Sequence, residues 1–117
     1  MAESIKTAVH AYYAEYLTYP ANTGITDITF MNRMLSNNPR GISFLEIAPK
    51  FVNTEGIVTP AGFYKGSVRT NFSINIDTQG VGILNNRVGT RTYSNSASVA
   101  VWVADPRDPN KPVGTFK

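Results

Sequence analysis

The chain contains no cysteine and only one histidine. Without cysteine it forms no disulfide, no thiolate nucleophile and no cysteine-ligated zinc site. His10 is predicted to lie on the polar face of a helix, with no carboxylate or nucleophile paired to it. Because acid–base catalysis requires positioned partners, we interpret His10 as a solvated side chain.

Signatures of catalysis and of highly charged partners are also missing. No glycine-rich phosphate loop, Gly-x-Ser-x-Gly segment or dinucleotide fingerprint occurs, and no two carboxylates have the spacing of a hydrolytic pair. Charged residues make up 16% of the chain and leave a net charge of +3, which is a weak field for attracting nucleic acid. We therefore expect a protein that is not an enzyme and does not bind nucleic acid.

The length and apolar content are those of a small globular domain. The chain has 117 residues, of which 42% are apolar. This is long enough for one hydrophobic core and short for two, so we expect a single domain over residues 1–117. No apolar run in these residues is long enough for a membrane-spanning helix.

The first segment of the chain has a helical period. The residues predicted to face a core are Ala8, Val9, Tyr12, Tyr13 and Tyr16, and those on the opposite side are Glu3, Thr7, His10 and Ala14. Pro20 ends this helix because proline has no backbone N–H and disfavours helical backbone at the residue before it. Since Met1-Ala2-Glu3 shows no cap signal, we expect the helix to continue upstream of Glu3.

A second helix and a long connection follow. Thr26-Asp27 is predicted to cap a short helix that carries Phe30, Met31, Met34 and Leu35 and ends at Ser36-Asn-Asn-Pro39. Residues 40–66 combine short apolar pieces with prolines and glycines, which predicts a loop-rich connection.

Strands are predicted in the second half of the chain. Residues 68–77 alternate strictly, with Phe72 on the core side and Asn71 on the solvent side. Thr78-Gln-Gly80 is predicted to turn this strand into Val81-Gly-Ile-Leu84 as a hairpin. A polar loop over 85–95 leads to a strand over 97–104 that is covered on both faces, and a tail follows Asp105. This order predicts an α+β fold, with an N-terminal amphipathic helix packed on a small antiparallel β-sheet.

Four short segments form an ordered set along the chain. They are Ala11-Tyr-Tyr-Ala-Glu-Tyr-Leu-Thr-Tyr-Pro20, Asn38-Pro-Arg-Gly-Ile-Ser-Phe-Leu-Glu46, Ala100-Val-Trp-Val-Ala-Asp-Pro106 and Val113-Gly-Thr-Phe-Lys117. The first resembles the Ala-Tyr-Tyr-x-Glu-Tyr-Gly-x-Tyr-Pro helix exit of type IV pilins and type II secretion pseudopilins. The others resemble the Asn-Pro-Arg-x-Ile-x-Phe-Leu-Glu segment, the Ala-Val-Trp-Ser-Ala-Gly-Pro strand end and the closing Ile-x-Ser-Trp-Lys of the same proteins.

The chain departs from the pilin pattern in two places. Thr59-Pro-Ala-Gly-Phe-Tyr-Lys65 lacks the Asp and Trp of the usual Asp-Pro-Trp-Gly-Asn-Pro-Tyr. Asp77-Thr-Gln-Gly80 keeps one carboxylate of an acidic turn that often follows the strand. The second departure weakens any metal site inherited from the family.

The resemblance implies the soluble head of a bacterial fibre subunit with a pilin-like fold. In that family an apolar N-terminal helix with a methylated N-terminus anchors the precursor in the inner membrane and later packs in the fibre core. Residues 1–117 would lack this transmembrane half of the first helix. The head would lie in the periplasm and then on an extracellular or periplasmic fibre, in contact with other subunits and the inner-membrane assembly machinery. His10, Ala11 and Ala14 would continue the fibre-facing side. Pilus and pseudopilus, and major and minor subunit, stay open.

Asp105 and Asp108 are the candidate metal ligands. The resemblance to calcium-binding pseudopilins implies that their carboxylates, with nearby carbonyls, bind Ca²⁺. The ion takes six to eight oxygen ligands, however, and Arg107 lies between the two acids. The alternative is that Asp-Pro-x-Asp-Pro forms a turn. No other cofactor is predicted.

Binding modules are the alternative class of function. A minor pilin or adhesin would recognise a glycan or a surface protein through aromatic side chains such as Phe51, Phe63, Tyr64 and Tyr93. The tyrosines of the first helix and its exit, in contrast, are predicted to pack helix against sheet.

Several arginines of the second half of the chain are candidates for a basic surface that binds nucleic acid. It would consist of Arg69, Arg87, Arg91 and Tyr93. No aromatic platform interleaves with these cations, so we interpret them as a solvated sheet face.

Overall fold

The structure is a computed structural model that describes residues 1–21, 24–59, 71–105 and 107–116. Within these ranges the helices are α1 (Ala2–Tyr16) and α2 (Ile28–Leu35), with a 3-10 turn, η1 (Pro49–Phe51). The strands are β1 (Gly24–Ile25), β2 (Val52–Asn53), β3 (Gly56–Ile57), β4 (Ser73–Ile76), β5 (Leu84–Val88), β6 (Arg91–Asn95), β7 (Val99–Asp105) and β8 (Asp108–Gly114).

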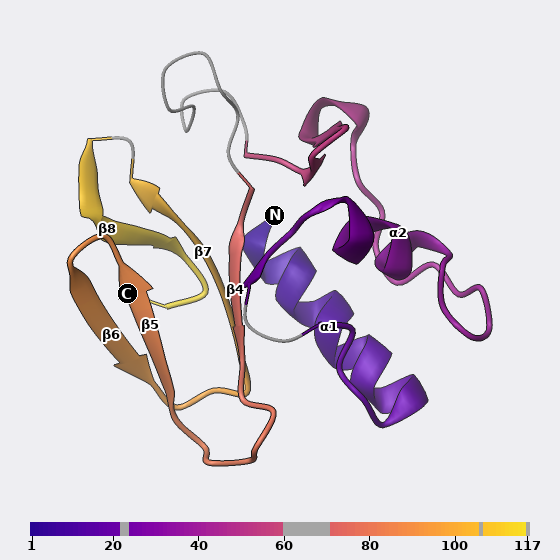
Figure 1. Ribbon diagram of the computed structural model, residues 1–117, viewed down its shortest axis with the longest axis horizontal. Helices are drawn as coiled ribbons and strands as arrows, with labels where there is room; N and C mark the ends of the chain where they lie inside the picture. The colour runs from indigo at the N-terminus through magenta and orange to yellow at the C-terminus, as the bar shows by residue number, and fades with distance from the viewer. Residues whose placement is uncertain (22–23, 60–70, 106, 117) are drawn as a thin grey trace.

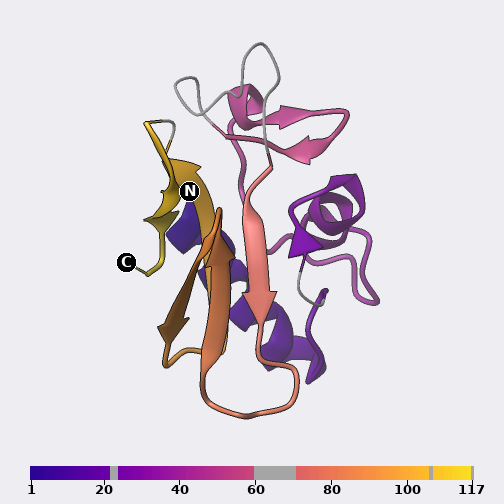
Figure 2. The ribbon, with the colours of Figure 1, turned by 60° about the vertical axis from the view of Figure 1, so that its left-hand side comes forward.

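The strands form three antiparallel sheets in the described part of the chain (Figure 1). The largest has the order β1-β4-β7-β8, while β2–β3 and β5–β6 are separate two-stranded hairpins. Figure 2 shows α1 behind the large sheet and the β5–β6 hairpin in front of it. The large sheet is therefore covered on both faces, by a helix on one and by a hairpin on the other.

The predicted helix period is confirmed for the buried face of α1. Ile5, Ala8, Val9 and Tyr12 are buried against β4 and β7, and the predicted polar-face residues are exposed. Tyr13 differs from the prediction, since 39% of its surface is exposed. No helix in the described ranges is long and apolar enough to cross a bilayer.

Strand β7 is the element shared by the two hydrophobic clusters. Val99, Val101 and Val103 point toward α1 and belong to the larger cluster. Ala100 and Trp102 point to the other face and belong to a second cluster with β5 and Phe116. The prediction that this strand is covered on both sides is confirmed.

The second helix begins and ends as its sequence predicts. The Asp27 carboxylate accepts a hydrogen bond from the backbone N–H of Phe30, at 2.9 Å, which satisfies one of the free amides of the first turn. Phe30, Met31 and Met34 are buried. The helix ends at Leu35, before the Asn-Pro pair.

The predicted fold class, a pilin-like α+β fold with one helix packed on one small sheet, is wrong. The chain is richer in sheet, because residues 84–95 form the β5–β6 hairpin where a polar loop was expected. Asn86 takes a core position that normally belongs to an apolar residue. It is fully buried, and its amide bridges Asn75 of β4 (2.9 Å) and Asn95 of β6 (2.8 Å). Hydropathy gives no signal for a core position that is satisfied by hydrogen bonds rather than by apolar contact.

Strand pairing after residue 76 also differs from the prediction. β4 pairs with β1 and β7, and no β4–β5 hairpin forms. The hairpin turn lies instead at Gly89-Thr90, between β5 and β6, and Gly89 has φ 61. There the side-chain oxygen of Asn110 accepts a hydrogen bond from the backbone N–H of Thr90 at 2.8 Å. A side chain at Gly89 would meet that oxygen, since a Cβ would lie 2.3 Å from it.

The predicted tail after Asp105 is a strand. β8 pairs with β7 at the edge of the large sheet. Its two prolines, Pro109 and Pro112, are tolerated because an edge strand has one side with no partner to donate to. At Gly114 a Cβ would lie 2.1 Å from the carbonyl oxygen of Val101, so this close approach requires glycine.

Candidate functional site

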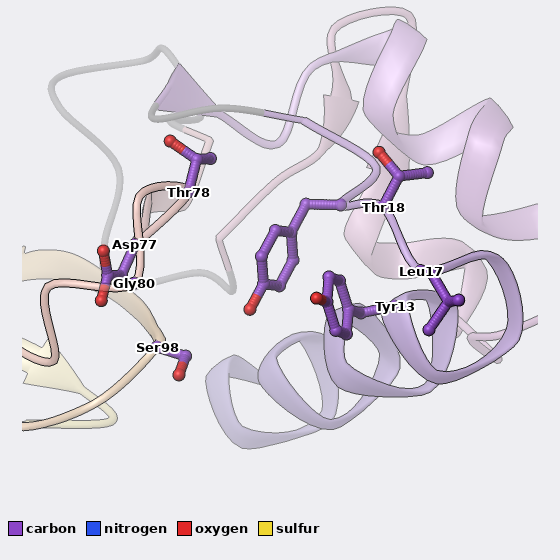
Figure 3. Close-up of a pocket in the computed structure, with 8 residues that line it drawn as sticks. Tyr13, Leu17, Thr18, Asp77, Thr78, Gly80 and Ser98 are labelled. Atoms are coloured by element: carbon purple, nitrogen blue, oxygen red, sulfur yellow. The ribbon is translucent and has the colours of Figure 1, made fainter.

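A surface pocket of about 410 Å³ lies between the end of α1 and the turn after β4 (Figure 3). We call it the tyrosine pocket. Its lining residues are Tyr13, Leu17, Thr18, Tyr19, Asp77, Thr78, Gly80 and Ser98. Figure 3 shows Tyr13, Leu17 and Thr18 on one side and Asp77, Thr78 and Ser98 on the other. One wall is therefore largely aromatic and the opposite wall polar.

The aromatic wall depends on how α1 ends. Leu17 adopts a left-handed conformation (φ 55), and its backbone N–H donates to the carbonyl of Tyr13 at 2.7 Å. This reversal brings Tyr19 back onto Tyr13, so that the rings stack with their centroids 4.4 Å apart and their planes 26° apart. Left-handed backbone is costly for a residue with a Cβ. Leucine thus occupies a position that favours glycine.

The polar wall is organised by Asp77. Its carboxylate accepts hydrogen bonds from the backbone N–H groups of Gly82 (2.7 Å) and Val81 (3.0 Å). These bonds, with Gly82 the larger contributor, lower the pKa of Asp77 from its ordinary value of 3.8. Asp77 is therefore held as an oriented carboxylate at neutral pH.

Hydroxyl groups complete the polar wall. In the described residues, the side-chain oxygens of Thr18, Thr78 and Ser98 make no hydrogen bond within the protein, and these three residues are exposed. A hydroxyl both donates and accepts. The arrangement offers groups for binding a polar ligand. Among the described lining residues, no hydroxyl is hydrogen-bonded to a basic side chain that would activate it as a nucleophile.

The structure places the candidate metal ligands at the turn between β7 and β8. Asp105 and Asp108 are register partners. Asp105 Oδ1 accepts from the backbone N–H of Arg107 (2.8 Å), and Asp108 Oδ1 accepts from that of Asn110 (3.0 Å). Both carboxylates therefore make the local turn contacts typical of aspartate. In the described part of the chain, no three His, Cys, Asp or Glu side chains lie close enough together to hold a metal ion.

The aromatic residues predicted for a binding module are not one site. Phe51 lines a different, apolar pocket with the N-terminal end of α1. Tyr93 packs on Phe116, and its hydroxyl donates to the carbonyl of Asn110 at 2.6 Å. Phe63 and Tyr64 lie outside the described residues, as does Arg69 of the predicted basic surface.

Sequence reasoning missed the tyrosine pocket. The sequence predicts that Tyr13 and Tyr19 pack against the sheet, and it presents Asp77 only as the one carboxylate kept from an acidic turn. The sequence carries one indirect signal, the resemblance of the helix exit, which has glycine at the position of Leu17; leucine itself does not indicate left-handed backbone.

Comparison with known proteins adds no assignment. No protein-family model, no curated protein sequence and no solved structure matches this chain. Its function must be inferred from its own residues and their geometry.

Proposed function

We propose that this chain is the head domain of a subunit of a bacterial surface fibre, either a type IV pilus or a type II secretion pseudopilus. Its work would be polymerisation rather than catalysis. The main support is Leu17, which has φ 55 at the position where the resembled helix exit has glycine. The backbone there keeps the conformation that glycine favours, although the side chain has changed.

Contacts between the first two resembling segments also support the proposal. The Tyr16 hydroxyl donates to Oδ1 of Asn38 and accepts from the backbone N–H of Arg40 at 3.1 Å. The Arg40 guanidinium pairs with Glu15. Tyrosine and glutamate of the helix exit thus meet asparagine and arginine of the Asn-Pro-Arg segment, which gives a physical reason for the two segments to occur together.

The last two segments are in contact as well. The rings of Trp102 and Phe116 meet edge to face, with centroids 5.3 Å apart. The backbone of Gly114 passes too close to Trp102 for a side chain. The proposal rests on these pairs of segments and not on the fold class, because the sheet arrangement differs from the expected one.

The exposed side of α1 is the proposed surface for neighbouring subunits. His10, Ala11 and Ala14 are exposed on it, and two of them are small residues that allow close helix approach. In this proposal the precursor is anchored in the inner membrane by an apolar helix that precedes α1. The head lies in the periplasm before assembly and reaches the fibre through the inner-membrane assembly machinery.

The test is assembly in cells that express the complete native gene. Ala14→Glu places a charge on the exposed face of α1, so the isolated domain should fold normally while fibres disappear from sheared surface fractions viewed by electron microscopy. Thr92→Glu, on the exposed side of β6, is the matched control and should leave fibres in place. Fibres unaffected by Ala14→Glu, or a native protein never found in fibres, would contradict the proposal.

A further inference from the structure

We propose that the tyrosine pocket binds a neutral saccharide. This function does not depend on assembly into a fibre, and it uses a different set of residues from the aromatic ones that the sequence suggested. The volume of the tyrosine pocket, about 410 Å³, is within the range of small-molecule sites in proteins, roughly 300–1,000 Å³.

The aromatic wall suits the apolar face of a sugar ring. Because Tyr13 and Tyr19 stack on each other, each ring keeps only its outer face available for a ligand. Tyr13 is 39% exposed, which is a large exposed aromatic surface for a residue on a helix that otherwise packs on a sheet. A pyranose presents C–H groups on one face and hydroxyl groups around its edge. A tyrosine offers the matching combination of an apolar ring and a polar tip.

The polar wall suits the hydroxyl edge of the same ring. The Asp77 carboxylate is oriented by the backbone amides of Gly82 and Val81, with weaker contributions from those of Gln79 and Gly80. It lies at the surface rather than enclosed in the core, so its oxygens stay accessible to ligand hydroxyls as well. Hydrogen bonds to an ionised acceptor are stronger than neutral ones. Thr78 and Ser98 add hydroxyls that have no partner within the described residues. A sugar hydroxyl that donates to Asp77 can also accept from one of them.

The charge of the lining excludes other ligand classes. Among the described residues, no lysine, arginine or histidine lines the pocket, and the charged group that a phosphate or an acidic sugar would meet there is the carboxylate of Asp77, which repels it. A cation is the competing candidate because it would be attracted to Asp77 and to tyrosine rings. The stacking of the two rings argues against it, since cation cages need aromatic faces that surround the ligand from several sides.

The experiment is an amide-shift titration of the ¹⁵N-labelled full chain. The probes are glucose, galactose, mannose, N-acetylglucosamine, maltose and lactose, added one at a time. At least one is expected to shift the amides of Thr18, Thr78 and Ser98 saturably, and to be insensitive to salt. Tyr13→Leu should weaken that binding about tenfold because it removes the ring face, whereas Tyr13→Phe should preserve it. Val81→Ala, exposed in the adjacent turn but outside the pocket, is the control.

Several results would overturn the proposal. They are the failure of all six sugars to shift the pocket amides, equal binding by Tyr13→Leu, and binding of tetramethylammonium that displaces the sugar and weakens with salt. If Tyr13→Leu does not fold, sugar binding is measured instead with Ser98→Ala and Thr78→Val, which remove hydroxyls of the polar wall. If both variants bind the sugar with unchanged affinity, these hydroxyls do not contact the ligand and the proposed site is wrong.

Discussion

The hydroxyl of Tyr16, at the end of α1, donates a hydrogen bond to the side-chain oxygen of Asn38, 22 residues later in the chain. Asn38 also receives the backbone N–H of Ile42 at 3.0 Å, and its amide donates to the carbonyls of Arg33 and Ile42. One side chain thus holds together the end of α1, the end of α2 and the loop between Asn38 and Ile42.

Removing this side chain should cost more than removing any one of its partners. Asn38→Ala is expected to lower the free energy of unfolding by about 2 kcal/mol, because several backbone groups lose a bond at once. Tyr16→Phe removes two hydrogen bonds, the one to Asn38 and the exposed one from the backbone N–H of Arg40, and should cost about 1 kcal/mol. Urea denaturation measures both. A Tyr16→Phe variant as unstable as Asn38→Ala would mean that the tyrosine, not the asparagine, is the centre of this network.

Leu17→Gly should stabilise the protein. The substitution relieves left-handed backbone at φ 55, a cost of about 1–2 kcal/mol for a residue with a Cβ. Glycine also raises the entropy of the unfolded chain, so the expected net gain is about 0.5–1 kcal/mol. Because Leu17 is 78% exposed, little apolar contact is lost. The measurement is thermal denaturation, with Thr18→Gly as the control that should show no gain. Destabilisation by Leu17→Gly would show that the leucine side chain itself contributes to packing.

Phe72 and Asn71 should both matter, for different reasons. Phe72→Ala is expected to cost about 3–5 kcal/mol, because the ring is buried in the main cluster and its loss leaves a cavity. Asn71 was expected on the solvent side, where alanine costs little. Its amide instead donates to the carbonyls of Thr26, Glu55 and Ile57. Asn71→Ala should therefore cost about 1–3 kcal/mol in urea denaturation. A cost near zero would mean that water replaces this amide without penalty.

The contribution of Asp77 should depend on pH. Its pKa is lowered in the folded state by the amides of Gly82 and Val81, so its stabilising effect is present above the ordinary value of 3.8 and is lost as pH falls through the folded pKa. Asp77→Asn should therefore be less stable than the native chain at about pH 7, and this difference should shrink at about pH 2.5. Urea denaturation at both pH values is the measurement. An equal difference in stability at the two pH values would show that the charge of Asp77 does not contribute to the stability.

Addition of Ca²⁺ should not raise the melting temperature. Asp105 and Asp108 each use one carboxylate oxygen for a backbone N–H in the turn, and Ca²⁺ would need at least four further oxygens. A ligand that binds only the folded state stabilises it by an amount that grows with the logarithm of its concentration relative to Kd, so calorimetry with Ca²⁺ and with a chelator is a direct measurement. A calcium-dependent shift that Asp105→Asn and Asp108→Asn abolish would assign both residues as ligands.

Periodic apolar segments were predicted well from the sequence. The buried face of α1, the Asp27 cap of α2 and the two covered faces of β7 all depend on local spacing that a single chain displays. These features need no knowledge of distant contacts.

Features that depend on polar groups meeting across the chain were missed. The β5–β6 hairpin has Asn86 at its buried centre, and the partners of that amide come from β4 and β6. Asn71 looked solvated because its three acceptors lie 14 to 45 residues away in sequence. The tyrosine pocket likewise joins residues 13–19 to residues 77–98. Hydropathy patterns indicate which side chains are buried, but not which polar groups form hydrogen bonds with distant parts of the chain.

The position of β7 between the two hydrophobic clusters affects how the molecule unfolds. Its valines belong to the core under α1, while Ala100 and Trp102 belong to the core under the β5–β6 hairpin. If either cluster loses its packing, one face of β7 becomes exposed to solvent. The other cluster also depends on that strand. The molecule should therefore melt as one cooperative unit, in which damage on the hairpin side is transmitted to the helix side through a single strand.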